Sequence, residues 1–369
     1  MSAPVTLPVS TGSASYEVVV GEGLLDTTGM HVSRLSDARA CALVTDENIR
    51  PLFGARVTGS LRDAGLEVTE VVVPAGERSK SWAAAGSLLE RLARAGLERT
   101  DLVVALGGGV IGDLAGFCAA VYLRGVDYVQ LPTTLLAQVD SSVGGKTGVD
   151  LEAGKNLAGA FKQPLVVLAD TQTLGTLAPV EWQSGLAEVA KAAMLAGPEQ
   201  LEWMTRHADS LVAREASAVR EAVLRAVRHK IDVVSADERE AGVRESLNYG
   251  HTLGHAIEQV AGYGVVPHGI AVAEGMRFAA RLASRLLGAP ADSGEAQERM
   301  LDSLGIERPT YPGDVDALVR AMHADKKARS GTVRFALVPE PGTFVAVPVA
   351  DEVLVGELRR WIDDSEEGR

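Results

Sequence analysis

The sequence contains very little cysteine: only Cys41 and Cys118 occur among its 369 residues. The two lie far apart, each inside an apolar run, so we expect buried thiols and not a disulfide or a metal-binding pair. Stabilisation by disulfide bonds is thereby excluded. Two reduced thiols fit the cytoplasm, which is where we expect this protein to work.

Long, uninterrupted apolar runs are also missing. The longest, residues 102–122, is broken by several glycines and by Asp113, so it is not a membrane span. The first residues show neither the basic nor the apolar segment of a secretory signal. We therefore expect a protein with no membrane partner.

A surplus of positive charge is absent as well. The chain has 36 Lys and Arg against 49 Asp and Glu, a net charge of −13, which argues against nucleic acid as a partner. It does not exclude a small anionic ligand, because a pocket can be locally basic. With 46% apolar and 23% charged residues, the composition is that of a globular protein.

Two patterns of secondary structure divide the chain near residue 178. Before it, β-rich runs alternate with helical stretches, which predicts an α/β nucleotide-binding domain with a Rossmann-like parallel sheet. After it, helical periodicity dominates, and only a late pair of strand-like runs predicts a hairpin. The predicted domains are 1–178 and 179–369, the second mainly α-helical. The strand-like runs are 16–20, 41–45, 68–73, 101–106, 127–131, 164–170, 333–338 and 343–349.

A glycine-rich turn follows the fourth strand-like run and precedes a helix. Gly107, Gly108, Gly109 and Gly112 would let a pyrophosphate approach the backbone at a helix N-terminus. Their spacing departs from the standard dinucleotide fingerprint. Taken alone, the turn fits nucleotide binding and simple packing equally well.

Polar turns after neighbouring strands favour the nucleotide. Asp46 and Asn48 end one run, Glu77 and Lys80 follow the next, and 132–134 adds two threonines. All would lie at the carboxyl edge of the sheet, where open α/β sheets bind ligands. Each turn, viewed singly, also fits a helix cap.

Three of the seven histidines fall within residues 251–268, which favours a metal site. His251 and His255 are spaced i, i+4 on one helical face, and His268 precedes another predicted helix. With Glu188 they would offer imidazole and carboxylate ligands suited to zinc or a similar ion. The H-E-x-x-H motif of metalloproteases is absent.

Basic residues gather in polar segments of this acidic chain. We expect Lys146 and Lys155 in glycine-rich loops, where they would bind anions, and Lys191 on the helical face of Glu188. Lys230 and Lys326 also fit solvated charges. Together with a metal and a nucleotide, these cations indicate a substrate that carries phosphate and carboxylate. The remaining polar candidates are Arg124, Arg244, Asn248 and Lys327.

These motifs resemble, in the same order, those of the 3-dehydroquinate synthases. The resemblance covers most of residues 40–340 and includes Arg124-Gly125, DERE (237–240), His268-Gly269 and DKK (325–327). Its longer motifs are GGGVIGDLAGF, PTTLLAQVDSSVGGKTGV, GKNLAGAF, GLAEVAK and LNYGHTLGHAIE.

The resemblance implies a dehydroquinate synthase-like fold, with NAD⁺ on the α/β domain and Zn²⁺ or Co²⁺ in the interdomain cleft. It implies Glu188, His251 and His268 as metal ligands and Arg124 as a residue that reaches the neighbouring subunit of a homodimer. The implied substrate or catalytic residues are Asp140, Lys146, Lys155, Asn156, Lys191, Lys230, Arg244, Asn248, His255 and Lys327, together with Arg124. The implied NAD⁺ contacts are Asp46, Asn48, Ala75, Gly76, Glu77, Arg78, Ser79, Lys80, Gly109, Val110, Ile111, Gly112, Asp113, Thr133, Thr134, Lys146, Lys155, Thr173, Leu174, Gly175 and Thr176.

The reaction implied is that of a phosphorus–oxygen lyase of the shikimate pathway. A small anionic sugar-acid phosphate, 3-deoxy-D-arabino-heptulosonate 7-phosphate, would be oxidised transiently by NAD⁺, lose phosphate, regain its hydride and close to 3-dehydroquinate. The temporary ketone makes an inert C–H acidic, and cationic side chains stabilise the developing charge.

Two rival hypotheses stay open. Other sugar phosphate cyclases, of the valiolone, deoxyinosose or amino-dehydroquinate type, share many of these motifs, although Lys230, Arg244, Asn248 and His255 match the carboxylate-binding kind. A metal-dependent polyol dehydrogenase would share the fold but release NADH. Ser79 departs from the family, in which many members carry an aromatic residue there; this would slightly alter the contacts to adenine or ribose.

Overall fold

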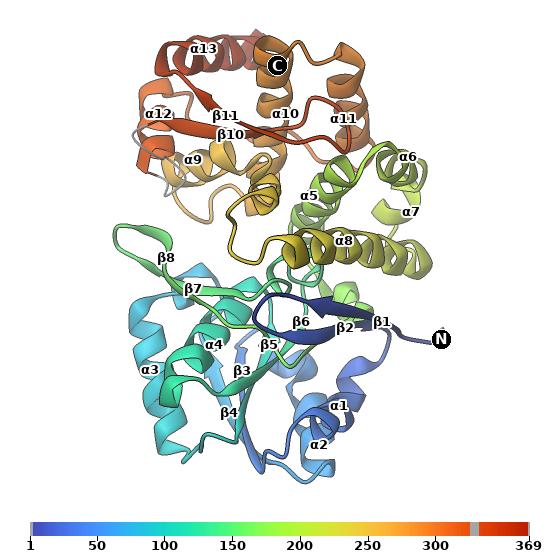
Figure 1. Ribbon diagram of the computed structural model, residues 1–369, viewed down its shortest axis with the longest axis vertical. Helices are drawn as coiled ribbons and strands as arrows, with labels where there is room; N and C mark the ends of the chain where they lie inside the picture. Colours follow the sequence, from blue (N-terminus) through green and yellow to red (C-terminus); the bar gives the residue numbers. More distant parts are fainter. Residues whose placement is uncertain (1–2, 325–331, 368–369) are drawn as a thin grey trace. The chain divides into compact units, whose positions relative to one another are not determined.

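The computed structural model describes residues 3–324 and 332–367 (Figure 1). The chain forms two compact units. The first comprises the residues up to Leu177 together with Lys230–Glu238, and the second comprises Ala178–His229 and the residues from Arg239 onward.

A seven-stranded sheet, in the order β1-β2-β9-β6-β5-β3-β4, organises the first unit. Every neighbouring pair is parallel except β1 and β2, so the predicted parallel sheet is confirmed. β1 escaped prediction; it is the edge strand, where Pro8 is tolerated because its missing N–H costs no ladder bond. The strands are β1 Val5–Ser10, β2 Ser15–Gly21, β3 Ala40–Asp46, β4 Glu67–Val73, β5 Leu102–Gly107, β6 Asp127–Pro132 and β9 Val166–Asp170.

Helices cover both faces of this sheet, as the nearly unbroken apolar runs of its inner strands require. Figure 1 shows α3 and α4 on one face of the sheet and α1 and α2 on the other. Along β3, Ala42 and Val44 join the core shared with α3 and α4, whereas Cys41 and Leu43 join the core on the opposite face. Cys41 and Cys118 are buried, reduced thiols, as predicted. The helices of this unit are α1 Thr28–Leu35, α2 Ala55–Asp63, α3 Trp82–Arg94 and α4 Gly109–Val121. Short helical turns lie at η1 Leu24–Thr27, η2 Arg50–Gly54, η3 Glu77–Ser79, η4 Tyr122–Arg124, η5 Ala137–Ser141 and η6 Thr171–Thr176.

A β-hairpin replaces the loops that we expected around Lys146 and Lys155. β7 Lys146–Leu151 pairs antiparallel with β8 Gly154–Phe161, so both lysines lie on strands and that expectation was wrong. The glycines that suggested loops instead allow the two strands to lie close together. A Cβ on Gly148 would lie 2.8 Å from the carbonyl oxygen of Ala158, too close for any side chain.

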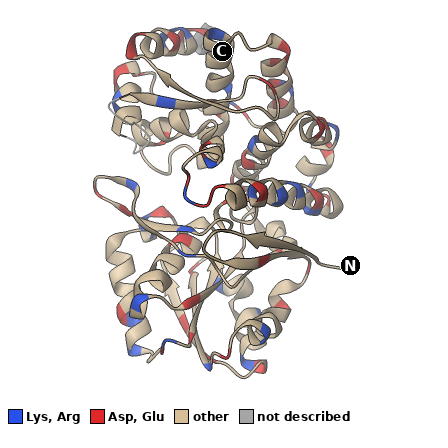
Figure 2. Cartoon of the chain, viewed as in Figure 1, with Lys and Arg blue, Asp and Glu red and all other residues tan. Residues whose placement is uncertain are grey.

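The second unit is mainly helical, as predicted, and its late strands β10 Val333–Leu337 and β11 Val345–Val349 form the expected antiparallel hairpin. Basic and acidic residues are interspersed along its helices (Figure 2). Over the described part of the chain, no helix is both long and apolar enough to cross a membrane. Its helices are α5 Pro179–Ala196, α6 Pro198–Arg206, α7 Ala208–Val212, α8 Ala216–Ala236, η7 Val243–Asn248, α9 His251–Ala261, α10 His268–Leu287, α11 Ala291–Ser303, α12 Val315–Ala324 and α13 Asp351–Glu367, with the end of α8 in the first unit.

Candidate active site

Glycines bring the backbones of α5, α9 and α10 unusually close together. A Cβ on Gly269 would lie 2.0 Å from the carbonyl oxygen of Ser184, and the Gly269 N–H donates to Ser184 Oγ at 2.9 Å. A Cβ on Gly254 of α9 would lie 3.1 Å from the backbone of Ala271 on α10. Because Glu188 is one helical turn beyond Ser184, this contact places it beside His268.

Glu188, His251 and His268 converge on one point in the second unit. Glu188 Oε1 lies 3.8 Å from His251 Nε2 and 3.7 Å from His268 Nε2. Glu188 is 2% exposed, yet its Oε1 accepts no hydrogen bond from the described residues. Ligand atoms around a tetrahedral ion with bonds of about 2.1 Å are separated by about 3.4 Å, so the spacing fits a divalent metal. The predicted ligand set is therefore assembled.

In His251 and His268, the hydrogen bond made by Nδ1 orients the ring so that Nε2 faces Glu188. His251 Nδ1 lies 3.1 Å from the carbonyl oxygen of Tyr249, which can only accept, so Nδ1 carries the proton. His268 Nδ1 lies 3.0 Å from Glu258 Oε2. In its neutral form, each ring therefore directs its Nε2 lone pair toward Glu188, which is the form in which imidazole binds a metal.

Lys191 supplies a cation beside the centre, on the same helical face as Glu188, as predicted. Its Nζ lies 2.5 Å from Glu188 Oε2 and donates to the carbonyl oxygen of Leu247 at 3.0 Å. The side chain is only 3% exposed, so the ion pair is held in a dry environment. A buried carboxylate is tolerated only with such compensation.

His255 lies next to the ligand set but outside it. Its ring centre is 5.3 Å from that of His251 and 5.8 Å from that of His268. Farther back in the sequence of the same unit, Asn248 Nδ2 donates to Glu240 Oε1 at 2.7 Å, and Arg244 is 2% exposed. The second unit therefore gathers the polar candidates that we placed on 244–255.

Sequence reasoning assigned no role to Glu240 or Glu258, although both stood inside the quoted motifs. A signal for Glu258 existed: it follows His251 by seven residues, so the i, i+4, i+7 pattern places it on the same helical face as the two histidines. A buried carboxylate on a face of imidazoles is a candidate partner for one of them.

In the first unit, the glycine turn is built for close packing. β5 ends at Gly107 and α4 begins at Gly109; a Cβ on Gly108 would lie 3.0 Å from Thr134 Cγ2, and one on Gly112 would lie 2.6 Å from Gln130 Oε1. A side chain at either position would make Thr134 or Gln130 shift, so packing alone already favours glycine here. The open N-terminus of α4 remains compatible with a phosphate.

Lys80 and Asp113, both predicted NAD⁺ contacts, form a buried ion pair, with Nζ 2.5 Å from Oδ2. Burial disfavours the charged lysine, but the carboxylates of Asp113, Glu77 and Asp150 outweigh it and raise the pKa of Lys80. Lys155 reaches the same turn from β8, with its Nζ 3.4 Å from Glu77 Oε1. Lys80 is thus held in its charged form, and its charge is balanced by the surrounding carboxylates.

Other predicted nucleotide contacts also have local structural partners. Asp46 Oδ1 accepts from the backbone N–H groups of Asn48 at 2.8 Å and Ile49 at 3.0 Å, the cap geometry that we considered. Thr173 Oγ1 donates to the carbonyl oxygen of Asp170 at 2.8 Å. Thr133 Oγ1 is buried and has no hydrogen-bond partner among the described residues, so it is a donor available at the end of β6.

Among the remaining candidates, Lys230 and Asp140 contact each other within the first unit. Lys230 Nζ donates to both the carbonyl oxygen and Oδ1 of Asp140 at 2.5 Å. Asn156 takes a left-handed conformation on β8 (φ 56°), and Arg124 does so in η4 (φ 69°). Lys326 and Lys327 lie outside the described residues, and nothing is concluded about them.

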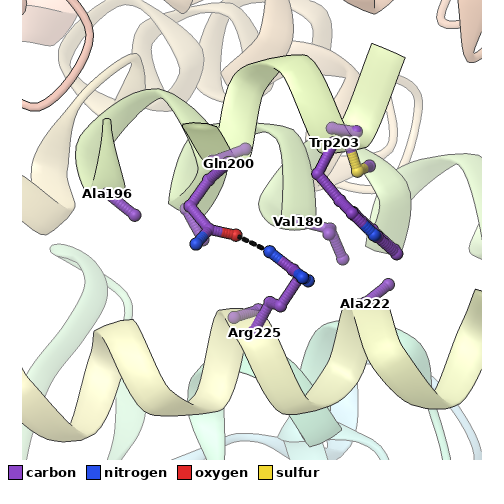
Figure 3. A pocket seen from close by; sticks show the side chains of 10 residues that line it. Val189, Ala196, Gln200, Trp203, Ala222 and Arg225 are labelled. Carbon is purple, nitrogen blue, oxygen red and sulfur yellow. Dashed lines mark hydrogen bonds between the residues drawn. The ribbon is translucent and has the colours of Figure 1, made fainter. Parts of the chain in front are cut away.

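A separate concavity lies between α5, α6 and α8 (Figure 3). Its volume of about 10 Å³ is near the smallest that admits one water molecule. Arg225 donates to Gln200 Oε1 at 2.7 Å and lies 4.7 Å from the Trp203 ring centre. Its guanidinium group is therefore engaged by neighbouring side chains. We assign no ligand to this pocket.

The parallel sheet with its glycine turn and the helical unit with one carboxylate and two imidazoles define a dehydroquinate synthase-like protein. Sequence models described as 3-dehydroquinate synthase N-terminal and C-terminal match residues 70–184 and 185–328. The 3-dehydroquinate synthase of Caulobacter vibrioides is 44% identical over 354 residues, covering 93% of this chain and 95% of that relative. The chain belongs to the 3-dehydroquinate synthase family.

Solved structures agree in fold. A 2-deoxy-scyllo-inosose synthase, complexed with carbaglucose-6-phosphate, NAD⁺ and Co²⁺, has a TM-score of 0.88 at 25% identity, covering 96% of this chain and 100% of that one. A 2-epi-5-epi-valiolone synthase from Streptomyces hygroscopicus subsp. jinggangensis, with NAD⁺ and Zn²⁺ bound, has a TM-score of 0.85 at 24% identity, covering 96% and 99%. The latter likeness concerns the fold alone.

Proposed function

We propose that this chain is an NAD⁺- and metal-dependent 3-dehydroquinate synthase, which converts 3-deoxy-D-arabino-heptulosonate 7-phosphate to 3-dehydroquinate and phosphate. The observation that carries the metal requirement is Glu188 Oε1, which is buried between two imidazole nitrogens and accepts no hydrogen bond within residues 3–324 and 332–367. Family membership over nearly the whole chain supports the reaction.

Zn²⁺ or Co²⁺ is the ion that we propose for Glu188, His251 and His268. Two nitrogens and one oxygen are a usual donor set for catalytic zinc, and the inosose synthase of similar fold holds Co²⁺ together with NAD⁺. A bound ion of this kind lowers the pKa of a coordinated hydroxyl and so favours its oxidation. The side chains of the site must then bind and orient the substrate.

The chain's own residues supply binding and charge stabilisation in this proposal. Residues 1–178 would bind NAD⁺, with Lys80 and the N-terminus of α4 as the proposed contacts to its phosphates. Residues 179–369 would carry the metal ligands, and His255 would move a proton on the substrate. The proposed contacts to the substrate's phosphate and carboxylate are Lys146, Lys155, Lys191, Lys230, Arg244, Asn248 and Lys327, with Asp140 and Asn156 orienting its hydroxyls.

A homodimer of cytoplasmic subunits is part of the same proposal. Arg124, expected to reach a neighbouring subunit, follows Val121 and Leu123, whose side chains are 43% and 38% exposed. Both residues are apolar, so a protein partner covering them would gain stability from their burial. Light scattering of the purified protein would test the dimer directly.

The reaction itself is tested by product accounting. Purified protein with NAD⁺, Co²⁺ and the heptulosonate phosphate should release one phosphate per substrate with no net NADH. Net accumulation of NADH would contradict the proposal and support a polyol dehydrogenase. Phosphate release from a sugar phosphate that lacks the carboxylate, with none from the heptulosonate, would support another sugar phosphate cyclase instead.

A further inference from the structure

Glu258 is buried in the second unit beside one of the three metal ligands. It is 3% exposed, and its Oε2 lies 3.0 Å from His268 Nδ1. That separation is the length of a hydrogen bond, not of two ligands that share an ion. The opposite ring nitrogen, Nε2, faces Glu188 at 3.7 Å. The two carboxylates therefore contact opposite nitrogens of one imidazole.

The geometry points to Glu258 as a positioning residue for the metal: it holds the His268 ring in the orientation and tautomer that direct Nε2 to the ion. This inference rests on the proposed function, because it presumes that Glu188, His251 and His268 bind a cation. A carboxylate that accepts the outer N–H of a ligating histidine fixes the ring and increases the basicity of its inner nitrogen.

The hydrogen bond that orients the His268 ring is stronger than the one that orients the His251 ring. His251 Nδ1 donates to the carbonyl oxygen of Tyr249, two residues away on the same chain segment, at 3.1 Å. His268 begins α10 and has 32% of its side chain exposed, so its own helix restrains the ring little. The Glu258 carboxylate adds a restraint from a second helix, α9, and ionised acceptors bind more strongly than neutral ones.

A second grouping, His255, Glu258 and His268, also has ligand atoms within 4.8 Å of one another. Glu258 could therefore be read as a metal ligand itself. The 3.0 Å contact to Nδ1 argues against this, because it is the distance of a direct hydrogen bond. Mutagenesis separates the two roles.

The test compares Glu258→Met with Glu258→Gln by titrating Zn²⁺ and Co²⁺ alone against a competing chelator. Methionine fills the buried space without an acceptor, so we expect the metal dissociation constant to rise roughly 10- to 100-fold. Glutamine keeps an acceptor oxygen at the same reach and should recover much of that loss. The visible absorption of bound Co²⁺ should shift in Glu258→Met and return toward the parent spectrum in Glu258→Gln.

Glu274→Met is the matched control. Glu274 is 2% exposed on α10, but its contacts in the described part of the chain are to Trp361, Arg277, Arg308 and Tyr311, with no histidine among them. The control should lower the melting temperature and leave the metal dissociation constant and the Co²⁺ spectrum unchanged.

Each other outcome overturns the inference in a recognisable way. An unchanged dissociation constant in Glu258→Met would overturn the positioning role alone. A loss far beyond 100-fold that Glu258→Gln does not recover would make Glu258 a ligand. A parent chain that binds neither ion would overturn the proposed function as well.

Discussion

A carboxylate as deeply buried as Glu188 needs positive charge close by, because desolvation otherwise costs several kcal/mol. Lys191 meets one oxygen at 2.5 Å, while the other faces two imidazole nitrogens. With both imidazoles neutral, their Nε2 lone pairs face this oxygen, and a cation placed among the three atoms would make the arrangement favourable. The residues themselves thus argue for the ion.

We expect His268→Ala to abolish metal binding while leaving the fold intact. Removing a ligand should weaken binding by more than the roughly 100-fold upper effect of removing a ligand's hydrogen-bond partner. Metal content after dialysis and circular dichroism measure the two effects. Full metal occupancy in the variant would contradict the assignment.

His207→Ala is the control for that experiment. His207 stacks on Trp203 with ring centres 4.5 Å apart, away from the ligand set. Its removal should reduce stability modestly and leave metal content unchanged. A similar loss of metal in both variants would indicate general unfolding of the helical unit.

Single residues were predictable where their spacing was diagnostic. The i, i+4 histidines of α9 and the i, i+3 pair Glu188 and Lys191 follow from helical geometry, and the structure assembles both. Glu258 was missed because a glutamate in a helix is usually solvated, and only tertiary packing buries it. Short-range pattern carries no information about that packing.

Strands were predictable where burial on both faces makes a run of consecutive residues apolar. The inner strands of the sheet are apolar runs, so β3, β5, β6 and β9 were found. The hairpin β7–β8 was not, because its glycines look like loop residues until the partner strand is known. The same ambiguity applies to the glycines of the helical unit, which serve helix contacts.

We expect Gly269→Ala to disturb the metal centre through its backbone. The added methyl would lie 2.0 Å from the carbonyl oxygen of Ser184, so α10 must move away from α5 and carry His268 from Glu188. Overpacking of this kind costs about 1–3 kcal/mol. Chemical denaturation and a metal titration should show lower stability together with weaker binding.

Gly294→Ala on α11 is the comparison for this variant. Its added methyl would meet only Ala280 Cβ at 3.9 Å, an ordinary contact. Alanine favours a helix interior over glycine by up to about 1 kcal/mol, so stability should stay equal or rise. Weakened metal binding in Gly294→Ala would show that the site is sensitive to any change in the unit, not to the α5–α10 contact.

At the scale of the whole molecule, the two kinds of predicted ligand belong to different compact units. Glu188, His251 and His268 all lie in the second unit, whereas the glycine turn and the ion pair of Lys80 and Asp113 lie in the first. The change of pattern near residue 178, from which we predicted two domains, lies beside the boundary of these units between Leu177 and Ala178. The return of 230–238 to the first unit was not predicted, because α8 is one continuous helix in sequence.

Each ligand should therefore protect its own unit against hydrogen exchange. At a metal concentration roughly 100 times the dissociation constant, binding adds about 2.7 kcal/mol to the free energy of opening the site, which slows exchange about 100-fold. We expect that protection in α5, α9 and the start of α10, with β3–β6 unchanged. NAD⁺ alone should protect the ends of β3, β4 and β5. Because a bound ion stabilises only the segments whose opening releases it, equal protection of both units by the metal would contradict a site built within the helical unit.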